Sequence, residues 1–254
     1  MDLFKKIPPA LISFVLLLLC WEGVVRLGVW SENVLPGPFA VGLGMWELAS
    51  SGLLLKHTVS SLFRVTAGFY LAVVLGVPAG ILLGYFVFAK RALNPIVQFF
   101  RPISPLAWIP LAMLWFGIGD KPAIFLIFLA SFFPLAVSTG AAVESIKKTY
   151  FQVAANFAFT KREIFTMIIF PAILPTVLVN LRISLGIAWI VVVAAEMIAV
   201  KSGLGFLIID SRNALRMDYV LDAMIIIGAI GVVLDSVMLR LATAREVQWG
   251  VRGR

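Results

Sequence analysis

The sequence has few residues suited to metal or covalent chemistry. It contains one cysteine, Cys20, and one histidine, His57, among 254 residues. One cysteine cannot form a disulfide within the chain, and a zinc site needs several ligands of these types. The chain also lacks the Gly-x4-Gly-Lys-Ser/Thr loop that binds nucleotide phosphates. We therefore predict no metal, no cofactor site and no catalytic centre in this chain, which argues against an intramembrane enzyme.

Charged residues are scarce as well. They make up 13% of the chain, against about 25% in soluble domains, whereas 61% of the residues are hydrophobic. This balance predicts a protein that spans a lipid bilayer several times. The net charge of +8 then indicates cationic cytoplasmic loops rather than nucleic-acid binding, since no basic patch is interleaved with aromatic residues.

The apolar runs predict a single all-α domain over residues 1–254 with six transmembrane helices. The first run is read as a retained helix because no signal-peptide cleavage site follows it. A shorter amphipathic piece, 39–50, is expected to lie at the membrane surface. Six spans place both termini on one side, and most of the 21 Lys and Arg residues fall there, which predicts cytoplasmic termini. The expected helices are 8–29, 58–88, 95–116, 122–143, 164–197 and 219–241.

Small residues recur at every fourth position in the second expected helix. Residues spaced by four share one face of a helix, and small residues there let a neighbouring helix approach closely. We therefore predict a tight helix–helix contact along this stripe, which consists of Gly68, Ala72, Gly76, Gly80 and Gly84.

Prolines interrupt the third and fifth expected helices. Three of them, Pro102, Pro105 and Pro110, fall within nine residues, and irregular backbone at membrane depth is tolerated where protein or a water-filled cavity surrounds it. Ser104 and Trp108 are thus candidate pore-lining residues, and a kinked packing helix is an equal alternative. Pro171 and Pro175 are expected to interrupt the fifth helix.

Three polar or aromatic residues of the fifth expected helix, Arg182, Trp189 and Glu196, follow one another at intervals of seven and so fall near one face. An arginine inside a membrane marks a transport pathway or a buried partner. One hypothesis is that this face lines a pore and that Arg182 helps anions to pass. The structural alternative is that Arg182 pairs with an acid or carbonyl of a neighbouring helix, with Glu196 at the outer interface.

A polar segment, 147–163, connects the fourth and fifth expected helices and carries two cations at each end. Thr160 and Glu163 have the spacing of a capping box, so a helix should begin there. An earlier short helix would present Tyr150, Ala154 and Phe157 on one face. Such a helix suits a groove on a soluble partner, and an interfacial helix lying on lipid headgroups is an equal alternative.

Residues Gln152 to Pro175 resemble the cytoplasmic signature loop of ABC importer permeases, whose usual form is Glu-Ala-Ala, three residues, Gly, and then an Ile/Leu-x-Pro pattern. The wider chain is similar to the nitrate/sulfonate/taurine/bicarbonate branch of that family. This second resemblance rests on stretches such as Leu35-Pro36-Gly37-Pro38, Arg101 to Pro110, Leu114 to Gly119, Leu181 to Gly186, Ala194 to Met197 and Ser202 to Phe206.

The resemblance implies a type I ABC importer permease fold in a bacterial cytoplasmic (inner) membrane. The chain would work as a homodimer with two ATP-binding cassette subunits, which bind ATP and Mg, and an extracytoplasmic substrate-binding protein. The solute would be a small anion such as nitrate, taurine or another sulfonate, or bicarbonate. Alternatives are a thiamine precursor, riboflavin or an aromatic acid, and more remotely a secondary transporter or channel. The implied ATPase-coupling residues are Tyr150, Gln152, Ala154, Ala155, Phe157, Ala158, Thr160, Lys161 and Arg162.

Two residues depart from the family pattern: Gln152 stands where Glu is usual, and Ala158 where Gly is usual. Gln152 keeps hydrogen-bonding capacity but removes a carboxylate that could pair with the ATPase. An alanine with positive φ costs about 1–2 kcal/mol. We therefore expect Ala158 to have ordinary helical geometry, or the break between the two helices to lie elsewhere.

Overall fold

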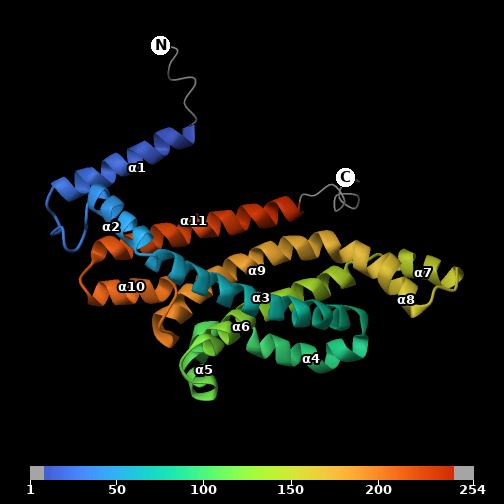
Figure 1. The fold of residues 1–254 in the computed structure, drawn as a ribbon. Coiled ribbons are helices and arrows are strands. Elements are labelled where there is room, and N and C mark those ends of the chain that lie inside the picture. The colour runs from blue at the N-terminus through green and yellow to red at the C-terminus, as the bar shows by residue number, and fades with distance from the viewer. Residues whose placement is uncertain (1–8, 243–254) are drawn as a thin grey trace, which may run out of the picture.

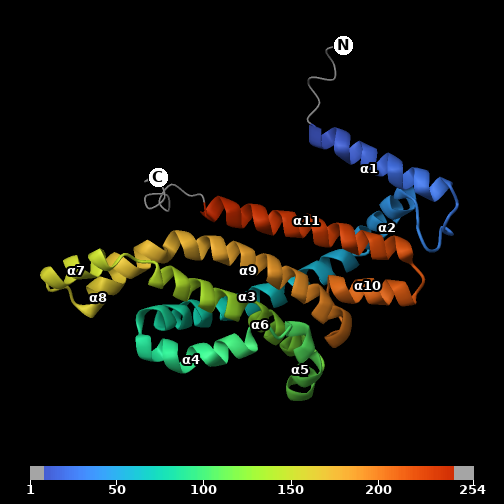
Figure 2. The same ribbon diagram turned by 180° about the vertical axis from the view of Figure 1, so that it is seen from behind.

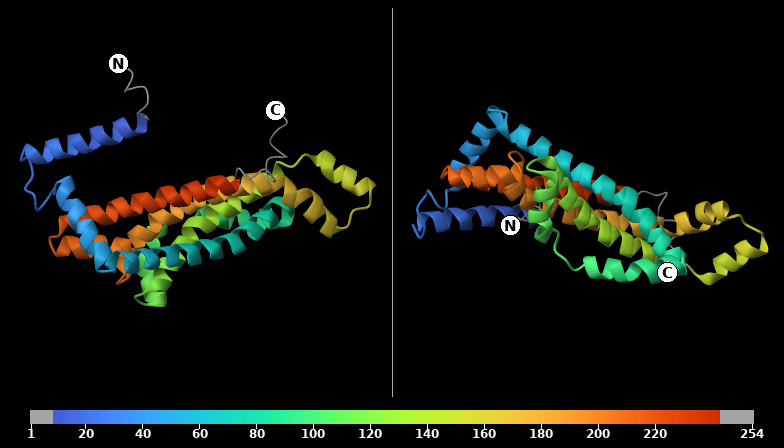
Figure 3. Two further views of the ribbon diagram at one scale, coloured as in Figure 1. Left: turned by 45° about the horizontal axis from the view of Figure 1, so that its top comes forward. Right: turned by 90° about the horizontal axis from the view of Figure 1, so that it is seen from below.

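The computed structural model describes residues 9–242, and over this range all its regular elements are helices (Figure 1). Long helices lie roughly side by side and give the molecule an elongated shape, whereas α1 stands apart except near its junction with α2 (Figure 3). The elements are α1 Pro9–Arg26, α2 Pro38–Ser50, α3 Leu53–Tyr85, α4 Val87–Phe100, the 3-10 turn η1 Pro105–Trp108, α5 Ile109–Phe116, α6 Asp120–Glu144, α7 Lys148–Asn156, α8 Lys161–Glu163, the π-helical η2 Ile164–Ile169, α9 Phe170–Ala199, α10 Leu204–Asn213 and α11 Met217–Ala242.

Four helices of the described range are long and apolar enough to cross a membrane: α3, α6, the continuous helix Lys161–Ala199, and α11. The pair Val87–Phe100 and Pro105–Phe116, bent by 84°, is a fifth span if it counts as one. The prediction of an all-α protein with several spans is confirmed. The number six is approximate, because four or five spans of the described range meet these criteria of length and composition.

The third expected helix, 95–116, is interrupted at its prolines, as predicted, but its first part begins earlier than expected, at Val87. The chain leaves α3 through one extended residue, Phe86, and enters α4 at once, so Lys90 and Arg91 lie within a helix. Pro102 and Pro105 then end α4 and begin η1, because a proline has no N–H for the helical hydrogen bond and clashes with the preceding turn. The sharp bend is the result.

The prolines of the fifth helix do not interrupt it. The chain is helical from Lys161 to Ala199, and the π-helical stretch η2 ends at Ile169, two residues before Pro171. A π turn is wider than an α turn, so it accommodates the ring and the missing N–H without a break. Between the expected helices 164–197 and 219–241, where no helix was predicted, the structure has the helix α10.

The stripe of small residues on α3 lies against α6. A Cβ atom on Gly80 would lie 2.5 Å from the Ala136 carbonyl oxygen, and one on Gly84 would lie 2.5 Å from the Gly140 carbonyl oxygen. A Cβ atom on Gly68 would lie 2.7 Å from Ile127, one on Gly76 would lie 3.2 Å from the Phe132 carbonyl oxygen, and Ala72 is buried. Side chains larger than hydrogen at the glycines would therefore separate the two helices.

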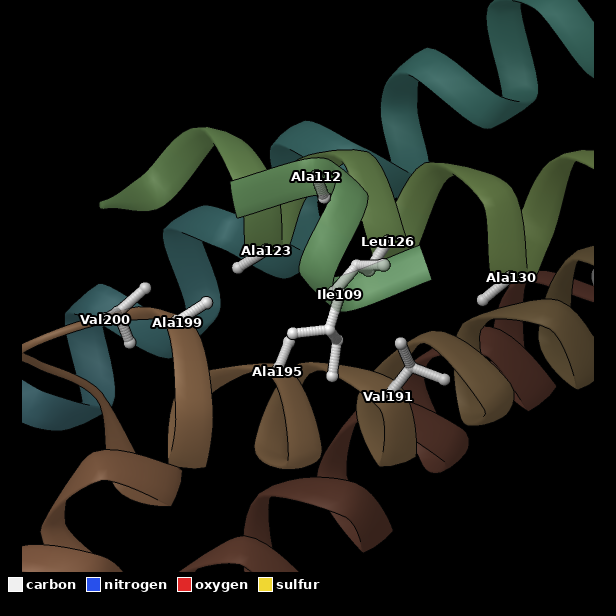
Figure 4. Close-up of a cluster of buried hydrophobic side chains, with 9 residues drawn as sticks. All are labelled: Ile109, Ala112, Ala123, Leu126, Ala130, Val191, Ala195, Ala199 and Val200. Atoms are coloured by element: carbon white, nitrogen blue, oxygen red, sulfur yellow. The ribbon is translucent and has the colours of Figure 1, made fainter. Parts of the chain in front are cut away.

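The core near one end of the bundle joins α5, α6 and α9. Small and branched side chains of the three helices interlock there, and α5 covers the ends of the other two (Figure 4). This cluster fixes how the ends of α6 and α9 meet. Its members are Ile109, Ala112, Ala123, Leu126, Ala130, Val191, Ala195, Ala199 and Val200.

Candidate functional site

The two short helices α7 and α8 form a hairpin at one end of the molecule, opposite α2 and α10 (Figures 1 and 2). This α7–α8 hairpin, residues 147–163, follows α6 and leads into the helix that continues as α9. Its four cations, Lys147, Lys148, Lys161 and Arg162, are all exposed. A positively charged structure of this kind can contact a protein surface or anionic headgroups.

Ala158 has a φ of +53°, so our expectation for this residue is wrong. The break lies at Ala158 itself. The Phe159 N–H donates to the Ala154 carbonyl at 2.9 Å, and the Ala158 N–H donates to the Ala155 carbonyl at 3.1 Å. These two bonds form a Schellman motif, which ends α7 and normally has glycine at the position of Ala158. The hydrogen bonds hold the alanine in a conformation that glycine would adopt without strain.

The predicted capping box at the start of α8 is confirmed. The Glu163 carboxylate accepts from the Thr160 backbone N–H at 2.7 Å, and the Thr160 hydroxyl accepts from the Glu163 N–H at 3.3 Å. The turn between α7 and α8 is thus held by hydrogen bonds on both sides, so the hairpin has a defined shape.

The expected face of Tyr150, Ala154 and Phe157 is not one exposed face. Ala154 is 1% exposed and turns toward the protein, whereas Tyr150 is 57% and Phe157 74% exposed. Phe151, the residue of α7 that follows Tyr150, packs against the hydrophobic cluster that contains Ile169. Gln152, Ala155 and Ala158 are also exposed, as are Thr160, Lys161 and Arg162.

A buried polar node lies toward the opposite end, where Arg64 of α3 is 2% exposed. Its guanidinium donates to Glu196 of α9 at 2.6 Å, to Asp120 at the start of α6 at 2.7 Å, and to the Ser202 carbonyl at 2.7 Å. Glu196 is fully buried. The node therefore ties three membrane helices to the turn that precedes α10.

The rest of the node positions that turn. The second Glu196 oxygen accepts from the Ser61 hydroxyl at 2.8 Å and from the Gly205 N–H at 3.0 Å. His57 Nδ1 accepts from the Gly203 N–H at 3.0 Å. Gly203 has a φ of +105°, and a Cβ atom there would clash with the Glu196 carboxylate. Because the Glu196 carboxylate fills the space beside position 203, only glycine fits there.

Two stretches that carry the family resemblance, 194–197 and 202–206, meet at this node, and Asp120 directly follows a third, 114–119. Sequence reasoning missed the node because it counted Arg64 only as one more charge near a helix end. An arginine within an apolar helix is itself a signal of a buried partner.

The proposed pore-lining face of α9 is not present as expected. Arg182 makes a two-bond ion pair with Asp235 of α11, at 2.6 and 2.7 Å. Trp189 is buried and donates to the Ile227 carbonyl at 3.0 Å, and Glu196 belongs to the polar node. Neighbouring helices of the same chain cover this face, so Trp189 and Glu196 are not free to line a pore.

The other candidate pore-lining residues lie at the bend between α4 and α5. Ser104 is exposed, and Trp108 is half-buried between Phe100 and Trp115, with ring centroids 5.9 and 6.5 Å away. The contacts within residues 9–242 do not show whether Ser104 and Trp108 line a transport pore, so this role stays a prediction.

At the end opposite the hairpin, α2 is fastened to α11. Glu47 accepts hydrogen bonds from Arg216 at 2.9 Å and from the Tyr219 hydroxyl at 2.8 Å. These two hydrogen bonds hold the pKa of the Glu47 carboxyl below its usual value, and the bond from Arg216 has the larger effect. The hydrogen bonds to Asp218 and Glu47 raise the pKa of Arg216.

Residues 72–246 match the family model described as "Binding-protein-dependent transport system inner membrane component". The chain is 33% identical over 252 residues to the taurine transport system permease protein TauC of Escherichia coli (strain K12), covering 97% of this chain and 91% of that protein. It is 32% identical over 243 residues to the nitrate import permease protein NrtB of Leptolyngbya laminosa, covering 92% and 85%.

A solved structure has a similar fold. The inward-facing structure of the MetNI methionine ABC transporter, in its CY5 selenomethionine-soak crystal form, superposes with a TM-score of 0.67 at 18% identity. The match covers 76% of this chain and 95% of that chain. Together with the family model, which spans more than half of the sequence, these similarities settle the family. The chain belongs to the binding-protein-dependent transport system inner membrane components.

Proposed function

We propose that this chain is the membrane-spanning subunit of an ATP-driven importer, and that it works as a homodimer with two separate ATP-binding subunits. An extracytoplasmic binding protein would deliver the solute. Family membership supports this proposal, as does the lack of a phosphate-binding loop in the sequence. In this role the chain is not an enzyme, and ATP and Mg are bound by its partners.

The observation that carries the proposal is the geometry of the α7–α8 hairpin, residues 147–163, which we call the coupling hairpin after the role proposed for it. It lies at the end of the bundle and exposes the aromatic rings of Tyr150 and Phe157. It is also held by the Schellman motif and the capping box. A rigid hairpin with exposed aromatic side chains is suited to enter a groove of a soluble protein and to transmit its movement. We assign this role to the hairpin, with the ATP-binding subunit as its partner.

The hairpin faces the cytoplasm in this proposal, and so do both chain termini. The cations at the base of the hairpin agree with the excess of Lys and Arg that membrane proteins carry on the cytoplasmic side. The membrane would be the bacterial cytoplasmic membrane.

The solute is a small anion or an organosulfonate in this proposal, because the similar proteins are named for taurine and nitrate. The described part of the chain has no ion pair or pocket that singles out one of them. We assign the choice between these solutes mainly to the binding protein. Competition of labelled taurine uptake by nitrate, bicarbonate and other sulfonates, in cells that contain the complete system, will identify the solute.

Purification of the tagged chain from native membranes tests the proposal. The wild-type chain should carry an ATP-binding subunit with it. The double variant Tyr150→Ala/Phe157→Ala should lose that subunit, whereas Ile190→Ala should keep it. Ile190 is a matched control, because it is 72% exposed but lies on the membrane helix α9. Absence of any ATP-binding subunit from the wild-type preparation would refute the proposed function.

A further inference from the structure

The ion pair between Arg182 of α9 and Asp235 of α11 remains partly exposed, unlike the buried Trp189 one helical face along. The two helices pack alongside each other (Figures 1 and 2). The guanidinium and the carboxylate are joined by two hydrogen bonds. The side chain of Arg182 is nevertheless 36% exposed and that of Asp235 is 52% exposed. Residues 9–242 therefore leave the outer side of this pair uncovered.

The depth of the pair in the membrane follows from its position relative to α6. Charged residues lie at the two ends of α6, and the stretch between Lys121 and Glu144 has none. The 25 residues of α6 extend about 37 Å, which is enough to cross a bilayer. Ser131, at the middle of α6, donates to the Ser184 carbonyl of α9 at 3.5 Å. Arg182 is two residues from Ser184, so the ion pair lies near the middle of the membrane.

Hydrocarbon is an unfavourable neighbour for a charged pair at this depth. Charged side chains within membrane spans face other protein or a water-filled cavity. Here the two charges already satisfy each other, and residues one turn away, Val179 of α9 and Val232 of α11, are exposed and apolar. A water-filled pathway would instead have a polar lining and charges free to meet a solute. Contact with protein fits this surface better.

The outer face of α11 has room for another helix beside the pair. Gly228, Val232 and Asp235 follow each other at spacings of four and three, so they share one exposed face of the helix. A Cβ atom on Gly228 would have no neighbour within 4 Å. A small residue on an open face lets a helix of another molecule approach closely. We call this surface, formed by Arg182, Gly228, Val232 and Asp235, the α9–α11 face.

We infer that a second copy of this chain covers the α9–α11 face. Two copies related by a two-fold axis present the same surface to each other. The α9–α11 face carries one cation and one anion, so it is complementary to itself: the guanidinium of each copy lies near the carboxylate of the other. The assignment of this face rests on the homodimer of the proposed function, and it identifies where the two membrane subunits meet.

Photo-cross-linking in the intact complex tests this contact. A photo-reactive amino acid at position 232 should cross-link two copies of the chain to each other, whereas the same probe at position 75 should not. Leu75 is a matched control, because it is 52% exposed and lies at a similar depth, where the adjoining Gly76 meets Phe132 of α6. A complex that retains its ATP-binding subunit but gives no cross-linked dimer from position 232 would overturn the dimer contact and leave the proposed function standing. Equal yields from the two positions would also overturn it.

The ion pair provides a second test of the same contact. Arg182→Asp places two acids on the α9–α11 face of each copy, and like charges across an interface are costly. The yield of cross-linked dimer from position 232 should therefore fall at least about tenfold. The exchanged variant Arg182→Asp/Asp235→Arg keeps one cation and one anion and should restore the yield. Lys90→Asp, which disrupts the exposed pair with Glu144 elsewhere, should leave it unchanged.

Retention of the ATP-binding subunit shows that each of these variants has folded. An unchanged yield in Arg182→Asp, or an equal fall in Lys90→Asp, would overturn the inference.

A water-filled pathway is the competing surrounding of this face. In a Cys20→Ser background, Val232→Cys places a single thiol there. A charged, water-soluble thiol reagent should modify this thiol far more slowly than that of Leu215→Cys, whose position is 76% exposed in the turn before α11. Slow modification together with the cross-linked dimer supports the second copy. Modification as fast as at position 215 would show that water reaches the face, and would overturn the inference.

Discussion

Ala158→Gly should stabilise the coupling hairpin. The alanine has a φ of +53° at the C-terminal Schellman motif of α7. Left-handed geometry costs an alanine about 1–2 kcal/mol relative to glycine. The greater freedom of glycine in the unfolded chain offsets about 0.4–1 kcal/mol of that gain. The net expectation is a stabilisation of about 0.5–1 kcal/mol, which is confined to the hairpin because Ala158 is exposed and far from the bundle core.

Hydrogen exchange of the α7 amides measures this local stability directly. The amides should exchange about two- to fivefold more slowly in Ala158→Gly than in the wild type. The matched variant Ala155→Gly places glycine at an exposed position within α7, where it should cost about 1 kcal/mol and speed exchange. Equal acceleration by both variants would refute the argument from backbone strain.

Three further predictions concern the bundle. Arg64→Met should lower the free energy of unfolding by about 3–5 kcal/mol, because it leaves Glu196 charged and buried without its cation. The melting temperature should fall less in the double variant Arg64→Met/Glu196→Leu than in Arg64→Met. A larger fall in the double variant would contradict this argument. Gly80→Val should prevent close α3–α6 packing and a monodisperse product, whereas Gly186→Ala, with no neighbour within 4 Å, should purify normally. The lowered pKa of Glu47 means that its contribution to stability is present above the unfolded pKa of about 4 and is lost as pH falls below it. Glu47→Gln should therefore reduce the loss of α2 protection, measured by hydrogen exchange, as pH falls from about 5 to about 2. An unchanged loss in acid would contradict this.

The elements that depend on residues close together in the sequence could be predicted. Long apolar runs give the membrane helices, and the spacing of Thr160 and Glu163 gives the start of α8, because both depend on residues close in sequence. The bend between α4 and α5 also follows from local chemistry, since the prolines cannot continue a helix.

Features that depend on distant partners were not predictable. Arg64 meets Glu196 only after α3 and α9 have packed, and they are separated by more than a hundred residues. Pairing of Arg182 with an acid or carbonyl of a neighbouring helix was one of the two expectations, but the sequence alone did not identify the partner as Asp235. Ala158 was mispredicted for a different reason: residue preference argues against positive φ, but the two hydrogen bonds of the Schellman motif outweigh that cost. Tertiary and capping contacts override local propensity at these positions.

The central claim is that the coupling hairpin contacts the ATP-binding subunit. A photo-reactive amino acid at position 157, where the native Phe157 is 74% exposed, tests this contact in intact membranes. The account predicts a cross-link to the ATP-binding subunit, with a yield that changes when ATP is supplied, and no such cross-link from the same probe at position 190. If an intact complex gives no cross-link to the ATP-binding subunit from position 157, the hairpin does not couple ATP hydrolysis to transport.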